Sequence, residues 1–220
     1  MKKVYCISGL GADERVFESI HVAAGELKFI CWQPPIEGES ISQYAQRLWG
    51  QISEPDPTII GLSFGGMMAI EMSKLRPVRK IVLLSSVKTR SELPLWMRTS
   101  GALKADKILP LKQYGRNPAF RALRPIQNYF LGVTNDREKK IANEYRDNVD
   151  PVYLNWAINQ VVNWQNVDVP AGIVHIHGTN DHIFPIRYVK PTHIIEGGGH
   201  FMIMNKFEEI NDILAAVLRF

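Results

Sequence analysis

The chain has 220 residues, of which 45% are hydrophobic and 22% charged, and its formal net charge is +4. This length suffices for one well-buried core, and the composition excludes a disordered, collagen-like or coiled-coil protein. The apolar run near Met1 is too short for a signal-peptide core, and no later run approaches the length of a membrane span. We therefore expect a soluble, cytoplasmic, single-domain protein.

Six short apolar segments, largely β-branched, are typical of strands buried on both faces. Amphipathic segments lie between most of them and end the chain, and this alternation predicts βαβ units. The sequence thus indicates an α/β fold with a mostly parallel sheet of about six strands, flanked by helices. The strands are expected at Val4–Ile7, Leu27–Trp32, Thr58–Leu62, Lys80–Leu84, Ile173–His177 and His193–Ile195, and helices at Ile41–Ile52, Met67–Leu75 and Phe207–Phe220.

The alternation breaks between Leu84 and Ile173, an interval that contains several prolines. We interpret residues 88–165 as an inserted helical cap, and residues 1–87 and 166–220 as the core. Asp136–Tyr145 and Pro151–Val162 have the best helical pattern within the cap. An insertion over the carboxyl edge of a sheet can form the apolar wall of a substrate pocket. We assign that role to Trp96, Met97, Phe130 and Trp156.

The basic excess of the chain lies within this insertion. Residues 88–147 hold 13 Lys and Arg against 6 Asp and Glu. The simplest interpretation is a solvated helical surface, and the alternative is a surface that attracts anionic substrates or a membrane. No helix-turn-helix, zinc-finger or RNP-like pattern accompanies the charge, so we expect a small-molecule substrate and no nucleic-acid partner.

One serine has the sequence context of a nucleophile. Ser63 lies in Gly61-Leu62-Ser63-Phe64-Gly65, with Gly66 behind it, between a predicted strand and a predicted helix. A sharp strand–turn–helix connection strains the serine backbone and brings the two elements too close for side chains at the flanking positions. The pattern therefore predicts that Ser63 is a nucleophile.

An acyl-transfer site also needs a base, an acid that orients the base, and donors for the oxyanion. His200 follows the last predicted strand in a glycine-rich loop and is the candidate base, and Asp181 follows the preceding strand and is the candidate acid. The oxyanion donors are expected to be the main-chain amides of Phe64 and Leu10, with Gly11 as the fallback for Leu10. The loop that holds Leu10 could also be only a tight turn into a helix capped near Asp13.

With these loops in order, the chain resembles the α/β-hydrolase superfamily, in particular small esterase-like serine hydrolases with a helical cap. The resemblance spans nearly the whole chain and includes the order Ser, Asp, His. Two features depart from the family pattern. The usual His-Gly of the oxyanion loop is Ser8-Gly9 here, which leaves open how this loop is held, and the chain begins at the family's third strand.

The resemblance implies a mechanism without cofactor or metal. His200 deprotonates Ser63, the serine attacks an ester or thioester carbonyl, and water then frees the acyl group. The same triad could serve a C–C bond hydrolase, a lyase or a perhydrolase, and a non-catalytic ligand receptor of this fold is a further alternative. A haloalkane dehalogenase is disfavoured because it needs a carboxylate where Ser63 stands.

The remaining polar candidates receive weaker assignments. His175, His177, Asp181 and His182 lie close in sequence and form a possible metal site, which we disfavour because the acid loop already accounts for part of the set. Cys6 and Cys31 lie in apolar runs without CxxC spacing, so we expect two buried, reduced thiols. We expect Ser85 and Ser86 to be strand-terminal hydroxyls, Glu71 to be a helix-surface residue and Glu196 a loop residue.

Overall fold

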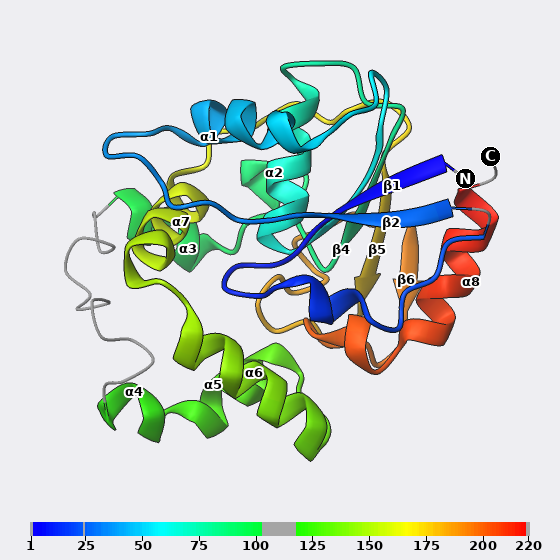
Figure 1. Cartoon of the computed structure of the whole chain (residues 1–220). Helices are drawn as coiled ribbons and strands as arrows, with labels where there is room; N and C mark the ends of the chain where they lie inside the picture. Colours follow the sequence, from blue (N-terminus) through cyan, green and yellow to red (C-terminus); the bar gives the residue numbers. More distant parts are fainter. Residues whose placement is uncertain (1, 24, 103–117, 219–220) are drawn as a thin grey trace.

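The computed structural model describes residues 2–23, 25–102 and 118–218. Its six strands form one sheet in the order β2-β1-β3-β4-β5-β6, and every neighbouring pair is parallel (Figure 1). The predicted α/β fold with a parallel sheet is therefore confirmed. The strands are β1 Lys2–Ile7, β2 Gly25–Ile30, β3 Thr58–Leu62, β4 Lys80–Leu84, β5 Val174–Gly178 and β6 His193–Ile195.

The helices also follow the predicted pattern, with shifted ends. Predicted helix Ile41–Ile52 is an α-helix only to Leu48 and continues as a short 3-10 turn. The last predicted helix ends at Val217 within the described residues. The α-helices are α1 Ile41–Leu48, α2 Phe64–Ser73, α3 Leu95–Ala102, α4 Pro118–Ala122, α5 Arg124–Leu131, α6 Asp136–Asn148, α7 Pro151–Asn163 and α8 Phe207–Val217, and the 3-10 turns are η1 Glu14–Phe17, η2 Trp49–Gln51, η3 Arg90–Glu92 and η6 Met202–Met204.

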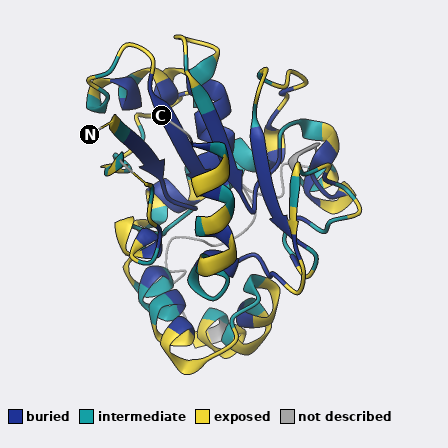
Figure 2. Cartoon of the chain, turned by 90° about the vertical axis from the view of Figure 1, so that its right-hand side faces the viewer, coloured by how far each residue is buried: buried dark blue, intermediate teal, exposed yellow. Residues whose placement is uncertain are grey.

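Side chains point alternately to the two faces of the sheet along each strand, and they form one apolar cluster on each face. In β1, Tyr5 and Ile7 pack in the cluster that contains α1 and α2, whereas Val4 and Cys6 pack in the cluster that contains α8. Successive strand residues point to opposite faces, so both faces must be apolar when helices cover both. The inner strands β1, β3, β4 and β5 are accordingly buried along most of their length (dark blue in Figure 2), whereas the edge strands β2 and β6 each have one buried residue.

Two predictions about single residues are wrong. Glu71 is not on the surface: it is 6% exposed, and its carboxylate accepts hydrogen bonds from Trp164 Nε1 at 2.8 Å and Lys74 Nζ at 2.5 Å. These donors compensate for the loss of water around a buried carboxylate. Cys31 is exposed because it lies just beyond the edge strand β2, whereas Cys6 is buried and burial raises the pKa of its thiol.

Helices α3 to α7 gather at the end of the sheet where the strands have their carboxyl ends (Figure 1). The amide of Phe201 donates to the Leu131 carbonyl at 2.8 Å, which joins α5 to the loop after β6. Tyr153 and Ala157 of α7 share a hydrophobic cluster with the sheet. The boundary between core and cap stays a prediction. None of the helices within the described residues is both long and apolar enough for a membrane crossing.

The central strands should dominate stability. Leu83 of β4 is 0% exposed, whereas Leu75 after α2 is 36% exposed. We expect Leu83→Ala to lower the free energy of unfolding by about 2–5 kcal/mol, because it removes buried methyl groups and leaves a cavity. Leu75→Ala should change it by about 0.5 kcal/mol or less. Urea unfolding measures both, and equal losses would contradict this description of the core.

Candidate active site

Ser63 lies at a strained backbone position between β3 and α2. Its φ of 52° and ψ of −117° fall in a region that residues with a side chain rarely occupy. Two hydrogen bonds hold this turn: Ser63 N–H donates to the Leu84 carbonyl at 2.9 Å, and Ser86 Oγ donates to the Ser63 carbonyl at 2.7 Å. Ser86 is a strand-end hydroxyl, as expected, and it fixes the turn.

The glycines around Ser63 are required by close backbone contacts. A Cβ at Gly61 would lie 2.5 Å from the Gly65 carbonyl oxygen and from Gly66 Cα. A Cβ at Gly65 would overlap the Ile7 carbonyl, and one at Gly66 would overlap Ser86 Oγ. The absence of three side chains therefore lets β3, α2 and the loop after β1 meet at Ser63.

The structure brings the three predicted catalytic residues into one hydrogen-bonded chain. His200 Nε2 is 2.9 Å from Ser63 Oγ, and His200 Nδ1 is 2.8 Å from Asp181 Oδ2. In the neutral tautomer that this geometry favours, Nδ1–H donates to the carboxylate and Nε2 accepts from the hydroxyl. All three residues follow the carboxyl ends of strands, so the parallel sheet places them at one edge.

Asp181 is buried and held in its ionised form. Its Oδ1 accepts hydrogen bonds from the main-chain amides of Ile183 and Phe184, each at 2.8 Å. Burial opposes ionisation most strongly, but His200, His177 and the Phe184 amide together outweigh it, so the pKa of Asp181 lies below its ordinary value. An ionised carboxylate at this position can orient the imidazole and stabilise the imidazolium that forms when His200 accepts a proton.

The main-chain amides of Leu10 and Phe64 are free to donate to a ligand. Within the described parts of the chain, neither N–H donates a hydrogen bond to a protein acceptor. Phe64 is the first residue of α2, and the loop of Leu10 passes Ser63 closely, since a Cβ at Gly9 would lie 3.5 Å from Ser63 Cβ. This placement provides two candidate donors beside the Ser63 hydroxyl.

The four residues expected in the apolar wall have different environments. Met97 and Trp156 pack in the cluster that contains Phe64. The Phe130 ring is 42% exposed and its centre lies 6.4 Å from that of His182 on the acid loop. Trp96 is 60% exposed and makes no described contact with the triad. The wall thus stays a prediction, with Met97 and Trp156 the better placed.

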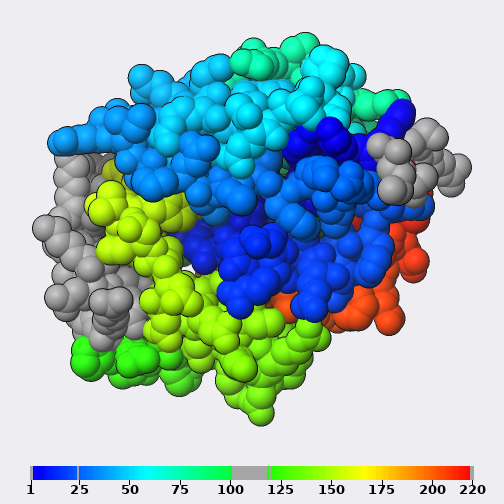
Figure 3. All heavy atoms as spheres, viewed as in Figure 1, coloured from blue at the N-terminus to red at the C-terminus, as the bar shows by residue number. Residues whose placement is uncertain are grey.

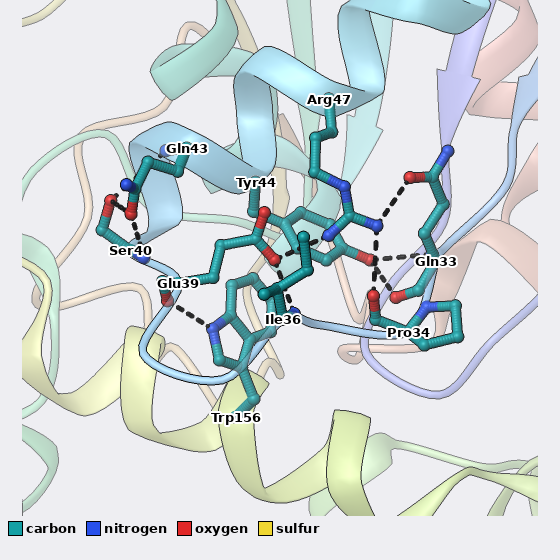
Figure 4. A network of polar contacts seen from close by, with 9 residues as sticks. All are labelled: Gln33, Pro34, Ile36, Glu39, Ser40, Gln43, Tyr44, Arg47 and Trp156. Atoms are coloured by element: carbon teal, nitrogen blue, oxygen red, sulfur yellow. Dashed lines mark hydrogen bonds and ion pairs between the residues drawn. The ribbon is translucent and has the colours of Figure 1, made fainter.

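Trp156 of α7 is tied to the segment that joins β2 to α1. Its Nε1 donates to the Glu39 carbonyl at 2.8 Å, and its ring centre lies 4.3 Å from that of Tyr44 (Figure 4). The Glu39 carboxylate in turn accepts from Arg47 Nη1 at 2.7 Å. Atoms of α7, yellow-green in Figure 3, accordingly lie against the light blue atoms of this segment. This network holds the Trp156 ring beside Phe64, with the two ring centres 6.1 Å apart.

Sequence reasoning missed two aromatic residues beside the site. Trp32 follows β2 and its ring stacks on Phe64, with the centres 5.3 Å apart and an interplanar angle of 18°. The Tyr153 ring of α7 lies 5.5 Å from Trp32. Trp32 could have been found from the sequence, because parallel strands bring their carboxyl ends to the same edge. Tyr153 could not, because its place depends on how the helices pack.

Three of the four side chains considered as metal ligands make other contacts, and the fourth, His175, packs against the His177 ring with the centres 5.2 Å apart. His177 Nε2 donates to the Phe184 carbonyl at 2.7 Å, and His182 stacks on Tyr129 with the ring centres 4.5 Å apart. Asp181 is engaged with His200. Among the residues that the structure describes, no group of three or more His, Cys, Asp and Glu side chains is arranged to hold a metal ion.

A family profile matches the sequence over most of its length. The profile of the alpha/beta hydrolase family covers residues 22–213, which include Ser63, Asp181 and His200. The chain belongs to the alpha/beta hydrolase family. This family assignment confirms the predicted resemblance and the prediction that the protein is an enzyme of this type.

Solved structures of this hydrolase's fold are numerous, and 531 chains match it. A bromoperoxidase from Bacillus anthracis is 18% identical with a TM-score of 0.74, and the match covers 99% of this chain and 91% of that one. An esterase from Exiguobacterium antarcticum is 15% identical with a TM-score of 0.66, covering 97% and 90%. A meta-cleavage product hydrolase from Pseudomonas fluorescens is 14% identical with a TM-score of 0.67, covering 99% and 90%. A sequence comparison with curated proteins finds no match. At these identities the structural matches show the fold alone.

Close packing at the elbow should make Gly61 intolerant of a side chain. Gly61→Ala places a methyl group against the Gly65 and Gly66 backbone, which cannot move without shifting α2. We expect a loss of about 1–3 kcal/mol or more in the free energy of unfolding. Gly50→Ala is the matched control, since a Cβ there meets nothing within 4 Å. Thermal or urea unfolding compares them, and similar stability of both variants contradicts the packing described.

Buried His175 should make the fold sensitive to acid. Burial, with His177 nearby, lowers the pKa of His175 to about 3. The unfolded chain binds a proton near the ordinary pKa of about 6.5 while the folded chain does not, so stability falls as pH drops from about 6.5 towards 3. The slope from one such group is at most about 1.4 kcal/mol per pH unit.

We expect His175→Leu to flatten this dependence between pH 6.5 and 4.5. The measurement is urea unfolding of both proteins across that range. If the free energies of unfolding of wild type and variant fell in parallel with pH, His175 would not be the neutral buried group described.

Proposed function

We propose that this alpha/beta hydrolase is a serine hydrolase that cleaves an ester or thioester of a small molecule through an acyl-enzyme on Ser63. In this proposal His200 is the general base, Asp181 orients it, and the amides of Leu10 and Phe64 form the oxyanion hole. The observation that carries the proposal is the continuous chain from Ser63 Oγ through His200 to Asp181, with contacts of 2.9 and 2.8 Å.

The proposed reaction has two half-reactions. Ser63 Oγ attacks the substrate carbonyl carbon while its proton moves to His200 Nε2, and the negative carbonyl oxygen accepts hydrogen bonds from the two amides. His200 then gives the proton to the departing alcohol or thiol, which leaves an acyl ester on Ser63. Water attacks that ester by the same route in the second half-reaction, and the products are a carboxylic acid and free serine.

The surroundings of Phe64 favour an apolar acyl group. Met97, Trp32 and Trp156 pack in the same cluster as Phe64, next to the proposed nucleophile. A wall of aromatic and aliphatic side chains contributes burial energy to an alkyl or aryl chain and offers few partners to a charged one. We therefore propose an ester or thioester with an apolar acyl part.

Other reactions on the same triad predict different products. A perhydrolase converts a carboxylic acid and hydrogen peroxide into a peracid, and a C–C hydrolase cleaves beside a ketone rather than an ester. A receptor of this fold binds a ligand and releases no product. A panel that contains p-nitrophenyl esters of increasing chain length, acetate with peroxide, and a vinylogous diketone separates these possibilities.

Ser63 should be the residue that reacts with a probe for activated serines. Wild-type protein should react with a fluorophosphonate probe and gain one adduct by intact mass, and Ser63→Ala should not. Ester hydrolysis should fall by about a thousandfold or more in Ser63→Ala, as when a triad member is removed in other serine hydrolases.

Ser85→Ala is the matched control, because Ser85 follows β4 in the same region but has no contact with His200. It should keep both labelling and hydrolysis. Labelling that survives in Ser63→Ala, or is lost only in Ser85→Ala, contradicts the assignment of Ser63.

Asp181 should be needed for fast turnover, because it orients His200. Asp181→Asn keeps the size of the side chain but offers the wrong hydrogen-bond partner to His200 Nδ1–H, so the imidazole adopts the unproductive tautomer. We expect kcat to fall by about 10³–10⁴, as in serine proteases changed in this way. Steady-state kinetics near neutral pH tests this, and a fall of less than tenfold in a folded variant would contradict the role of Asp181.

A further inference from the structure

The loop between β1 and η1 holds one of the two proposed oxyanion donors and contains two glycines. It reads Ser8-Gly9-Leu10-Gly11-Ala12, and Gly11 has a φ of 73°. Glycines lose more conformational freedom on folding than other residues. An oxyanion donor helps catalysis only when its N–H is already directed at the reacting oxygen. Something must therefore hold Leu10 in place.

Ser8 closes this loop with its side chain. Its Oγ donates to the Ala12 carbonyl at 2.7 Å and accepts from Trp32 Nε1 at 3.0 Å. A main-chain bond from Ala12 N–H to the Gly9 carbonyl, at 3.1 Å, closes the inner turn. Leu10 is thus enclosed by two hydrogen bonds that both end on Ala12. Ser8 is 5% exposed, so water competes little for its hydroxyl.

Trp32 connects the loop to the other proposed donor. Its indole N–H binds Ser8, while its ring face stacks on Phe64 at 5.3 Å. Offset stacked aromatic pairs are stabilising beyond the area that they bury. One side chain therefore contacts both the residue that holds Leu10 and the residue whose own amide is the second donor.

Packing restrains this loop over only part of its surface. A surface pocket of about 220 Å³ lies beside it, lined by Ser8, Ala12, Asp13 and Trp32 among others. Elsewhere the loop meets the backbone of α2 at Gly65, and Gly11 lies close to Val149. Where the loop borders the pocket, its hydrogen bonds supply the restraint that packing does not.

We propose that Ser8 and Trp32 form a latch, made of the two hydrogen bonds on Ser8 Oγ, that positions the loop of Leu10. The two residues are positioning residues: they act through Leu10 and Phe64 and do not touch the reacting atoms. The proposal rests on the proposed function, and it predicts a defect in transition-state stabilisation rather than in substrate binding.

The kinetic test uses two matched pairs of variants. Ser8→Ala should lower kcat for the best p-nitrophenyl ester about tenfold and change KM by less than about twofold, because one oxyanion donor is displaced but not removed. Ser73→Ala is its control, since Ser73 Oγ also donates to a carbonyl at 2.7 Å but lies at the far end of α2. It should keep wild-type kcat.

The second pair tests the indole. Trp32→Phe keeps an aromatic ring on Phe64 but removes the N–H, and we expect a fall in kcat of about threefold to tenfold. Trp49→Phe makes the same change at an indole that donates to the Met72 carbonyl at 3.1 Å, away from the loop, and should leave kcat unchanged.

Because both latch bonds share Ser8 Oγ, the Ser8→Ala/Trp32→Phe double variant should be no slower than Ser8→Ala alone. Multiplicative losses in the double variant overturn the latch.

A readout independent of catalysis separates this proposal from the proposed function. Hydrogen exchange measured by mass spectrometry on the peptide that contains Ala12 should be at least tenfold faster in Ser8→Ala than in wild type and Ser73→Ala, because the Ala12 N–H loses its restrained turn. Unchanged exchange overturns the latch whether or not the protein cleaves esters. An inactive wild type with faster exchange in Ser8→Ala supports the latch and refutes the proposed function.

Discussion

The whole site depends on one steric constraint, the contact of three backbones around Ser63. Strand β3, helix α2 and the loop after β1 meet where Gly61, Gly65 and Gly66 leave no side chain between them. This contact places the Ser63 hydroxyl above the sheet edge and the first amide of α2 beside it. It also forces Ser63 to a φ of 52°, a strain that the surrounding hydrogen bonds must hold.

The parallel sheet extends this constraint to the other two residues of the proposed triad. Asp181 and His200 lie after β5 and β6, which are neighbours in the sheet, so their loops emerge side by side. Gly178 lets the acid loop approach the loop of Gly198 and His200, because a Cβ there would overlap the Gly198 carbonyl. The 2.8 Å contact between Asp181 and His200 follows from that approach.

The sequence was most informative where chemistry depends on local backbone geometry. The strands Thr58–Leu62, Lys80–Leu84 and His193–Ile195 have the bounds expected from their apolar runs, and the glycine pattern located Ser63. It was least informative where position depends on tertiary packing. The burial of Glu71 follows from Trp164, far along the chain, which no local pattern reveals. The exposure of Cys31 follows from the edge position of β2, which the order of strands along the chain does not give.

The sequence left open how the loop of Leu10 is held. The structure places Trp32, from the segment that follows the neighbouring strand β2, against Ser8. A serine hydroxyl is too short to reach far across the loop, but it can accept from Trp32 and donate to Ala12 at once. The register of β1 and β2, with Ile7 opposite Ile30, brings the two residues to the same edge.

The proposed mechanism requires an acyl group on Ser63 during turnover. A rapid-quench experiment with a p-nitrophenyl ester of an apolar acid, followed by intact mass and peptide mapping of the quenched protein, tests this. We expect a burst of p-nitrophenol close to one equivalent per chain and an acyl group on the peptide that contains Ser63. Steady ester cleavage with no acyl group on the protein, or with the acyl group on another residue, would contradict it.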